Sequence, residues 1–186
     1  MKPAFAGATA LLVSLSCSAP PPLPMLGQIP AFALTAQTGQ PFQSESLDGK
    51  IWVADFIYST CTGPCPRMSS LMRQVQAAVS TYGDAVKLVS FTVDPERDTA
   101  VILAQYAERY HAQDGRWFFL TGERETLHRL KREAFKLGDV DGSLNHSTRL
   151  VLIDRRGRIR GYYGTTDESP VVQIVRGIKQ LRKEAS

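Results

Sequence analysis

The sequence predicts an α/β domain in which helices flank a central mixed sheet, and three observations support this prediction. First, apolar runs typical of buried strands alternate along the chain with segments whose apolar residues recur at helical spacing. Second, two strand-like segments near the end of the chain are separated only by Arg155-Arg156-Gly157, which indicates an antiparallel hairpin. Third, the 186 residues are 43% hydrophobic and 22% charged, the composition of an ordinary globular domain with a sizeable core.

The first half of the domain contains two predicted strand–helix pairs. Residues 50–58 (KIWVADFIY) are nearly continuously apolar, which indicates a strand buried on both faces. A helix is predicted over 66–83, because apolar residues recur there at helical spacing and a glycine marks its end. Residues 85–93 form a second apolar run and are predicted to be a second buried strand. A helix follows within 94–112, with an N-cap at Asp98 or Thr99 and apolar or aromatic positions on alternating turns: Val101, Ile102, Gln105, Tyr106 and Tyr110.

The second half continues the alternation and closes with a hairpin and a helix. A short strand is predicted over 116–122, followed by a third helix over 123–137 with four residues facing inward: Leu127, Leu130, Ala134 and Phe135. Strands over 147–154 and 158–164 form the hairpin, and a helix over 169–183 completes the domain. The predicted order is β-α-β-α-β-α-β-β-α. Residues 31–49 are expected to form a small N-terminal extension with Gly39 and Gly49 in turns.

The N-terminal stretch has the features of a targeting segment. After a positive start, residues 5–15 are apolar but shorter than the roughly 20 residues that cross a bilayer. Cys17 directly follows Ser16, which suggests a bacterial lipoprotein signal over 1–17 with Cys17 acylated. Ser14 stands where such signals usually have Leu, and an uncleaved membrane anchor is the alternative hypothesis.

A proline-rich segment separates this leader from the rest of the chain. Residues 18–30 contain five prolines, so we expect a stiff, extended tether between the membrane and a folded domain over 31–186. A chain exported and held in this way would face the periplasm or another extracytoplasmic space.

The net charge of +4 is unevenly distributed. Residues 1–119 carry −1 and residues 120–186 carry +5. The basic half could face an acidic partner or anionic lipid, although a solvated basic surface is the simpler interpretation. No motif of RNA- or DNA-binding proteins is present in the sequence, so no nucleic-acid partner is predicted.

Two of the three cysteines are placed for chemistry. Cys61 follows the first predicted strand, and Cys65 lies at the start of the first helix, where Pro66 suits the first helical position. In this order of elements, two cysteines at a strand-to-helix turn make the arrangement thioredoxin-like. A helix start favours the thiolate, which both redox attack and metal binding require. An exported pair can also form a disulfide.

The spacing of the pair also suits a soft metal ion. Two sulfurs leave zinc under-coordinated, whereas Cu(I) accepts few ligands and binds both thiolate and imidazole. For His111 and His128, which lie at or within polar helical segments, an exposed structural role is the better interpretation. His146 lies in a loop directly before a predicted buried strand, where thioredoxins usually have a proline. Because that loop is expected beside the cysteine turn, His146 is the candidate third ligand.

Three segments, DFIYSTCTGPCPRM, VSFTVDPERDT and NHSTRLVLID, together resemble the SCO/SenC family of copper-binding proteins, which act in cytochrome c oxidase assembly. The similarity covers about residues 32–181. It implies a thioredoxin-like fold and copper bound by Cys61, Cys65 and His146. Many members have Pro directly after the first cysteine, where this chain has Thr62, which leaves redox tuning and partner choice open.

The second of these segments contains two further acidic residues of interest. Asp94 is a candidate for orienting the metal loop or meeting a partner. For Asp98 the favoured interpretation is a helix cap.

These observations lead to a copper metallochaperone as the first functional hypothesis. It would hold Cu(I), or also Cu(II), and deliver it to the copper-site subunit of cytochrome c oxidase or another acceptor by exchange of thiolate ligands. The alternative is a thiol-disulfide oxidoreductase acting on the acceptor's cysteines, in which Cys61 attacks and Cys65 resolves. A redox or copper sensor is a third hypothesis. A structural disulfide would explain the cysteine pair but neither its position at a helix start nor His146.

Overall fold

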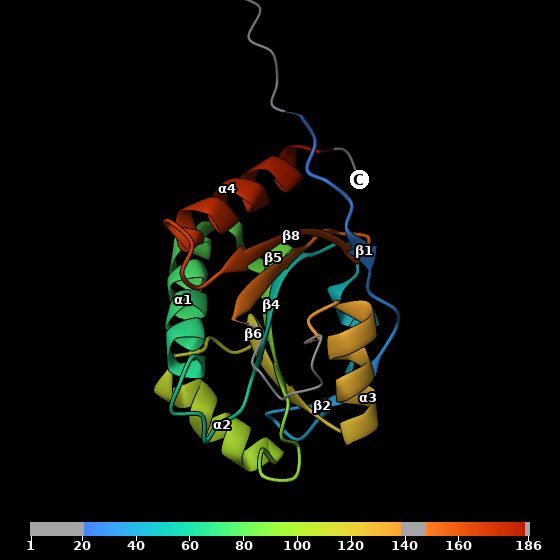
Figure 1. The fold of residues 1–186 in the computed structure, drawn as a ribbon, viewed down its shortest axis with the longest axis vertical. Helices are drawn as coiled ribbons and strands as arrows, with labels where there is room; N and C mark the ends of the chain where they lie inside the picture. Colours follow the sequence, from blue (N-terminus) through green and yellow to red (C-terminus); the bar gives the residue numbers. More distant parts are fainter. Residues whose placement is uncertain (1–20, 139–147, 185–186) are drawn as a thin grey trace, which may run out of the picture.

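The computed structural model describes residues 21–138 and 148–184 of the chain. At its centre is an eight-stranded sheet with the order β1-β8-β7-β4-β5-β6-β2-β3 (Figure 1). The strands are β1 (Gly27–Gln28), β2 (Ala33–Ala36), β3 (Pro41–Gln43), β4 (Ile51–Ile57), β5 (Val86–Thr92), β6 (Trp117–Thr121), β7 (Arg149–Ile153) and β8 (Arg158–Gly164). The helices are α1 (Cys65–Ala78), α2 (Ala100–Arg109), α3 (Arg124–Arg129), which continues as a π-helix (Leu130–Ala134), and α4 (Pro170–Lys183).

The sheet is mixed, as predicted. Strands β4, β5 and β6 are parallel, and β7 pairs antiparallel with β4. Every residue of β4 and β5 is buried, which explains their continuous apolar runs. The predicted hairpin joins β7 to β8, and Gly157 in its turn has φ of 71°, a conformation that favours glycine. The N-terminal extension contributes β2 and β3, and β2 enlarges the sheet by pairing with β6.

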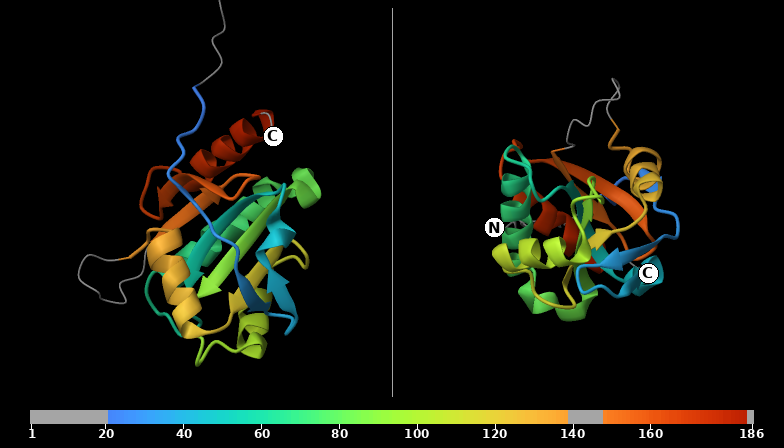
Figure 2. Two further views of the ribbon diagram at one scale, coloured as in Figure 1. Left: turned by 90° about the vertical axis from the view of Figure 1, so that its right-hand side faces the viewer. Right: turned by 90° about the horizontal axis from the view of Figure 1, so that it is seen from below.

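Helices cover both faces of the sheet (Figure 2). Helices α1, α2 and α4 contribute to the core on one face. Helix α3 and the N-terminal segment pack on the other, around a cluster of aromatic rings. In that cluster Phe91 stacks on Phe56 with 5.0 Å between ring centroids and meets Phe135 edge-on at 5.4 Å. The four residues predicted to face inward from the third helix are all buried: Leu127, Leu130, Ala134 and Phe135.

Helix α2 begins at one of the two predicted N-caps but packs on a different face than the sequence suggested. Its N-cap is Thr99, whose hydroxyl accepts a hydrogen bond from the backbone N–H of Ile102 at 3.4 Å. Leu103 and Tyr106 are buried, whereas Val101 is 68% exposed. Residues three and four apart share a helix face, so packing through Leu103 turns Val101 outward.

The described part of the expected tether is packed against the domain. Arg160 donates hydrogen bonds to the carbonyls of Leu23 and Pro24, and the Gln180 side chain donates to the carbonyl of Pro21. Prolines lack a backbone N–H but keep their carbonyl acceptors, which these side chains use. Residues 21–28 of the expected tether are therefore bound to the domain.

The parallel strands give the molecule two distinct ends. The carboxyl ends of β4 and β5 carry the cysteine loop and the loop over 93–99; we call this the site end. At the amino end of β4, the backbone of Arg155 accepts a hydrogen bond from Gly49, and its side chain donates to the carbonyl of Leu181 in α4. Residues 21–26 lie at this second end, which we call the tether end. Within the described ranges, no helix is both long and apolar enough to cross a bilayer.

Candidate thiol and metal site

The two cysteines lie where strand β4 passes into helix α1. Cys65 is the first residue of α1, as expected, with Pro64 at the N-cap position. Both cysteines are unbridged and buried, Cys61 with 7% of its surface exposed and Cys65 with none. The backbone N–H of Cys65 donates to Sγ of Cys61 at 3.4 Å. This donor belongs to the unpaired N–H groups of the helix start, which favour a negatively charged sulfur.

The two thiols have opposite electrostatic surroundings. Burial opposes ionisation of Cys61, but hydrogen bonds from Cys65, from the backbone of Gly63 and from the side chain of Tyr58 outweigh it, so the pKa of Cys61 is lowered. For Cys65, burial and the proximity of the Cys61 sulfur raise the pKa far above its ordinary value. Cys61 is therefore the thiol that ionises first.

This asymmetry predicts unequal reactivity of the reduced chain. At neutral pH iodoacetamide should modify Cys61 more than about tenfold faster than Cys65, because each pKa unit changes the thiolate fraction tenfold. Tandem mass spectrometry of the peptide between Lys50 and Arg67 would follow both rates. In urea the two rates should converge, because the difference arises from the fold. Equal rates in the folded chain would contradict the assignment.

Asp98 connects the cysteine loop to the neighbouring strand. Its carboxylate, only 1% exposed, accepts hydrogen bonds from the backbone N–H of Ser59 and from the hydroxyls of Ser59 and Thr92. Ser59 lies two residues before Cys61, and Thr92 ends β5. The interpretation of Asp98 as a helix cap is therefore wrong. The sequence did contain a signal for this contact. Two polar residues, Ser59 and Thr92, lie at the ends of neighbouring apolar runs, where one carboxylate can accept hydrogen bonds from both.

Asp94 lies nearer the surface of the same loop. Its backbone N–H donates to Thr92 Oγ1 at 2.9 Å, and its carboxylate pairs with Arg97 at 3.0 Å. Its charge is one of the smaller causes that raise the pKa of Tyr58, after the hydrogen bond to Cys61 and burial. Asp94 thus lies beside the cysteine loop, where its expected orienting role stays a prediction.

These two aspartates should differ sharply in their effect on stability. Asp98→Ala should lower the free energy of unfolding by about 3 kcal/mol, because it leaves buried donors of Ser59 and Thr92 without their acceptor. Asp94→Ala, the matched control, should cost less than about 1 kcal/mol, because its partner Arg97 is 72% exposed. Urea unfolding of the reduced chain measures both. Similar losses in the two variants would contradict the role given to Asp98.

The carboxyl group of Asp55 lies on the face of β4 that packs against the core containing Cys61 and Cys65. Asp55 is fully buried, and neither carboxyl oxygen has a hydrogen-bond partner among the described residues. Ser90 lies opposite Asp55 on β5. It lowers the pKa of Asp55 by less than burial raises it, although no hydrogen bond of ordinary geometry joins the two side chains. Burial raises the pKa of Asp55 to about 7. Its charge in turn contributes to the raised pKa of Cys65.

No role of Asp55 was predicted from the sequence. The available signal was a single acidic residue within a strand whose other residues are apolar. Such a residue is seldom fully buried without a partner.

Two expected site residues, His146 and Cys17, lie outside the described residues. Thr148, two positions after His146, accepts a hydrogen bond from the backbone of Thr165, whose carbonyl accepts one from Arg67 in the first turn of α1. The chain therefore enters β7 beside the start of α1, as the fold prediction required. In the described ranges, no three His, Cys, Asp or Glu side chains form a metal-binding group.

The other two histidines lie away from the cysteine turn. The carbonyl of His111 accepts a hydrogen bond from Gln76, near the far end of α1 from Cys65. His128 lies on α3, which packs on the opposite face of the sheet.

Comparison with known proteins gives consistent matches. A family model described as SCO1/SenC matches residues 26–182. A candidate copper-binding protein of Stutzerimonas stutzeri is 35% identical over 149 residues, which are 75% of this chain and 71% of that protein.

Solved structures agree with these matches. A crystal structure of a SCO1/SenC family lipoprotein from Bacillus anthracis superposes with a TM-score of 0.76 at 30% identity, over 84% of this chain and 96% of that one. BsSco, described as a member of the Sco family of cytochrome c oxidase assembly proteins and as having a disulfide switch, superposes with a TM-score of 0.76 at 26% identity, over 89% of this chain and all of that one.

Proposed function

The chain belongs to the SCO1/SenC family, and from this premise we propose that it binds copper as cargo and delivers it during assembly of cytochrome c oxidase. The observation that carries the proposal is the pair of free, adjacent sulfurs at the start of α1, one of which has a lowered pKa. The copper-binding description of the Stutzerimonas relative and the oxidase-assembly description of BsSco support it.

The donor set fits a soft ion. The sulfurs of Cys61 and Cys65 lie on one short turn in a site that is nearly closed to solvent. Thiolates bind Cu(I) well, and an imidazole completes a three-ligand set. We assign the third ligand to His146, because the chain enters β7 beside the first turn of α1 two residues later.

The residues of the chain would handle ligands and protons in a defined order. Cys61 ionises first and is the sulfur that engages the cargo, while the loop around it is held by Asp98 through Ser59. Cys65 must then release its proton, which its raised pKa makes costly. Thiolates of an acceptor would displace the two sulfurs one after the other. Because both ligands must be deprotonated, copper affinity should fall as the pH is lowered.

A Cu(I) titration tests the proposal. The reduced chain should bind one copper ion, and Cys61→Ser/Cys65→Ser should bind none with comparable affinity. Cys17→Ser is the matched control, because it also replaces a cysteine but leaves the pair intact. Unchanged stoichiometry in the double variant would refute copper binding at this site. Oxidase activity of cells lacking the protein, with and without added copper, would test delivery.

Thiol-disulfide exchange is a second candidate function, favoured by the unequal pKa values of the two thiols. The Cys61 thiolate would attack an acceptor disulfide and release one of its sulfurs as a thiolate. Cys65, after losing its proton, would then attack Sγ of Cys61, so that the acceptor ends as a dithiol and this chain as a disulfide. Turnover with a dithiol partner that does not depend on His146 would favour this function. No observation favours a sensor.

We further propose that the chain is exported and held at a membrane by its N-terminal segment, through a lipid on Cys17 or an uncleaved anchor. The related Bacillus anthracis protein is described as a lipoprotein, which supports the first form. The intact mass of the chain extracted from membranes would distinguish the two, since lipoprotein processing cleaves off residues 1–16 and adds lipid at Cys17.

A further inference from the structure

The tether end carries a dense group of positive side chains. Helix α4 contains four cations, Arg176, Lys179, Arg182 and Lys183, and no acidic residue. The β7–β8 turn adds Arg155 and Arg156, and Arg155 donates to the carbonyl of Leu181. We call these six cations, together with residues 21–26, the basic pole.

The cations of the basic pole are not neutralised by the protein. None of the six forms an ion pair with a described residue. The nearby carboxylate of Glu184 is engaged by Arg160 at 2.9 Å. Asp84, at the amino end of β5, binds both Lys50 and Lys87. The guanidinium of Arg182 lies 4.0 Å from the ring centroid of Tyr82, which leaves its charge without a counter-ion.

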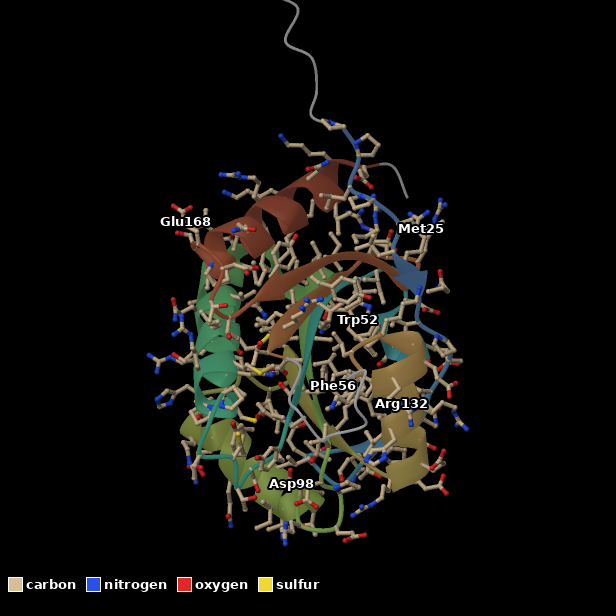
Figure 3. The ribbon with its side chains drawn as sticks, in the orientation of Figure 1. Met25, Trp52, Phe56, Asp98, Arg132 and Glu168 are labelled. Carbon is tan, nitrogen blue, oxygen red and sulfur yellow. The ribbon has the colours of Figure 1, made fainter. Side chains whose placement is uncertain are left out.

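At the site end, two cations are paired with acids. Arg97 pairs with Asp94, and Arg124 pairs with Glu96 at 2.7 Å. Glu168 precedes the first turn of α4 (Figure 3), and that helix of 14 residues places it about 20 Å from the last turn. Six of the fourteen cations in residues 120–186 therefore lie together at one end of the fold.

Apolar side chains lie exposed beside these cations. Met25 is 70% exposed and Leu26 is 37% exposed. They belong to the segment that Arg160 and Gln180 hold against the domain through the carbonyls of Pro21, Leu23 and Pro24. Cations next to exposed apolar residues are the combination found where proteins rest on the headgroup region of a membrane.

The length of the chain places this surface near any N-terminal anchor. Pro21 is held at α4, and it lies four positions after Cys17. Four residues span at most about 14 Å. An anchor that ends at Cys17 thus keeps Pro21 within about 14 Å of the bilayer, which allows the cations of the basic pole to come within a Debye length of anionic lipid.

We infer that the basic pole docks on an anionic phospholipid surface, with its six cations facing lipid phosphates and Met25 and Leu26 entering the interface. This inference rests on the proposed membrane attachment. Because the cysteines lie at the opposite end of β4, docking would turn Cys61 and Cys65 away from the bilayer. Figure 3 shows Met25 toward the upper part of the molecule and Asp98, beside the cysteine loop, at the lower end. The thiols would then face acceptors that project from the membrane.

Two tryptophan reporters in the full chain test this orientation. Met25→Trp places a reporter in the basic pole, and Val101→Trp places one at the site end, where Val101 is 68% exposed. The native Trp52 and Trp117 are buried and give a constant background. In vesicles containing phosphatidylglycerol, emission from Met25→Trp should shift to the blue and be quenched by brominated lipid. Val101→Trp should show neither effect, and phosphatidylcholine vesicles should produce neither in either variant.

Charge variants give the matched comparison. Lys179→Gln/Arg182→Gln/Lys183→Gln should weaken docking about 100-fold, since each cation near anionic lipid contributes a factor of about five. Arg109→Gln/Arg129→Gln/Arg132→Gln removes the same charge from α2 and from α3 with its continuation, and should change nothing. About 1 M salt, which shortens the Debye length to about 3 Å, should release the pole.

The outcomes separate this inference from the proposed attachment. Equal responses of the two reporters, or equal effects of the two charge variants, would overturn docking. If the full chain did not float together with phosphatidylcholine vesicles, the N-terminal attachment would be refuted instead. The phosphatidylglycerol-dependent signal of Met25→Trp would still decide whether the pole docks.

Discussion

His146→Ala should weaken Cu(I) binding by more than about 100-fold while the fold stays intact. Loss of a residue that only supports a metal ligand already costs about 10–100-fold in affinity, so loss of a ligand should cost more. Two sulfurs would remain, but the third donor of the proposed site would be gone. Competition against a Cu(I) chelator measures the affinity, and far-UV circular dichroism checks the fold.

The other histidines provide matched controls for this experiment. His111→Ala and His128→Ala should bind copper like the unsubstituted chain, because neither residue lies near the cysteine turn. If His146→Ala also bound with unchanged affinity, the third ligand would have to be sought elsewhere. Copper delivery by the cysteine pair could then still hold without His146 as a ligand, and the thiol-exchange function would be favoured more than before.

Asp55→Asn should raise the stability of the reduced chain at pH 8 by up to about 4 kcal/mol and leave it nearly unchanged at low pH. The pKa of Asp55 is about 7 in the folded chain against an ordinary value of 3.8. Between these values the unfolded chain ionises the group while the folded chain keeps it protonated. The stability of the unsubstituted chain is therefore highest below pH 3.8 and falls as the pH rises through 7, so the gain from Asp55→Asn reaches its full size above pH 7. Each unit of difference corresponds to about 1.4 kcal/mol.

Urea unfolding between pH 4 and 8 would measure this effect as the difference between the unsubstituted chain and the variant. Asp84→Asn is the control, because the two lysines Lys50 and Lys87 lower the pKa of Asp84 to about 2. Its contribution to stability is lost only as the pH falls toward 2, outside the range measured. Parallel pH profiles for the unsubstituted chain and Asp55→Asn would show that the Asp55 carboxyl group is not buried in its protonated form.

Asp55 destabilises the folded chain at neutral and higher pH, and its electrostatic effect on Cys65 gives it a function there. The charge of Asp55 is among the causes that hold the pKa of Cys65 high. It therefore favours the protonated form of the thiol that must be deprotonated to bind metal or to resolve a disulfide. Above pH 7, where Asp55 is ionised, Asp55→Asn should accordingly speed the alkylation of Cys65 and leave that of Cys61 less affected.

The order of strands and helices was predictable because it depends on local pattern. The continuous apolar runs of β4 and β5 are buried throughout, and the helical spacing on α3 faces the core as expected. The proline and the onset of helical spacing predicted the start of α1 to within one residue, and with it the place of Cys65 at the helix start. Predictions failed where a residue binds a partner far away in the sequence and not the neighbouring helix. Asp98 serves Ser59, 39 positions away, and so leaves the N-cap to Thr99.

The sequence by itself determined the α/β fold, the cysteine pair at a strand-to-helix turn, the candidate ligands and the family to which they point. These depend on residue type, spacing and hydrophobic period, which are properties of neighbouring residues. Only the tertiary structure decided that Asp55 lies buried without a partner, that Asp98 holds the cysteine loop, and that residues 21–26 are bound beside six unpaired cations. Burial and charge pairing depend on which distant segments meet in space, and a single sequence carries no direct record of those contacts.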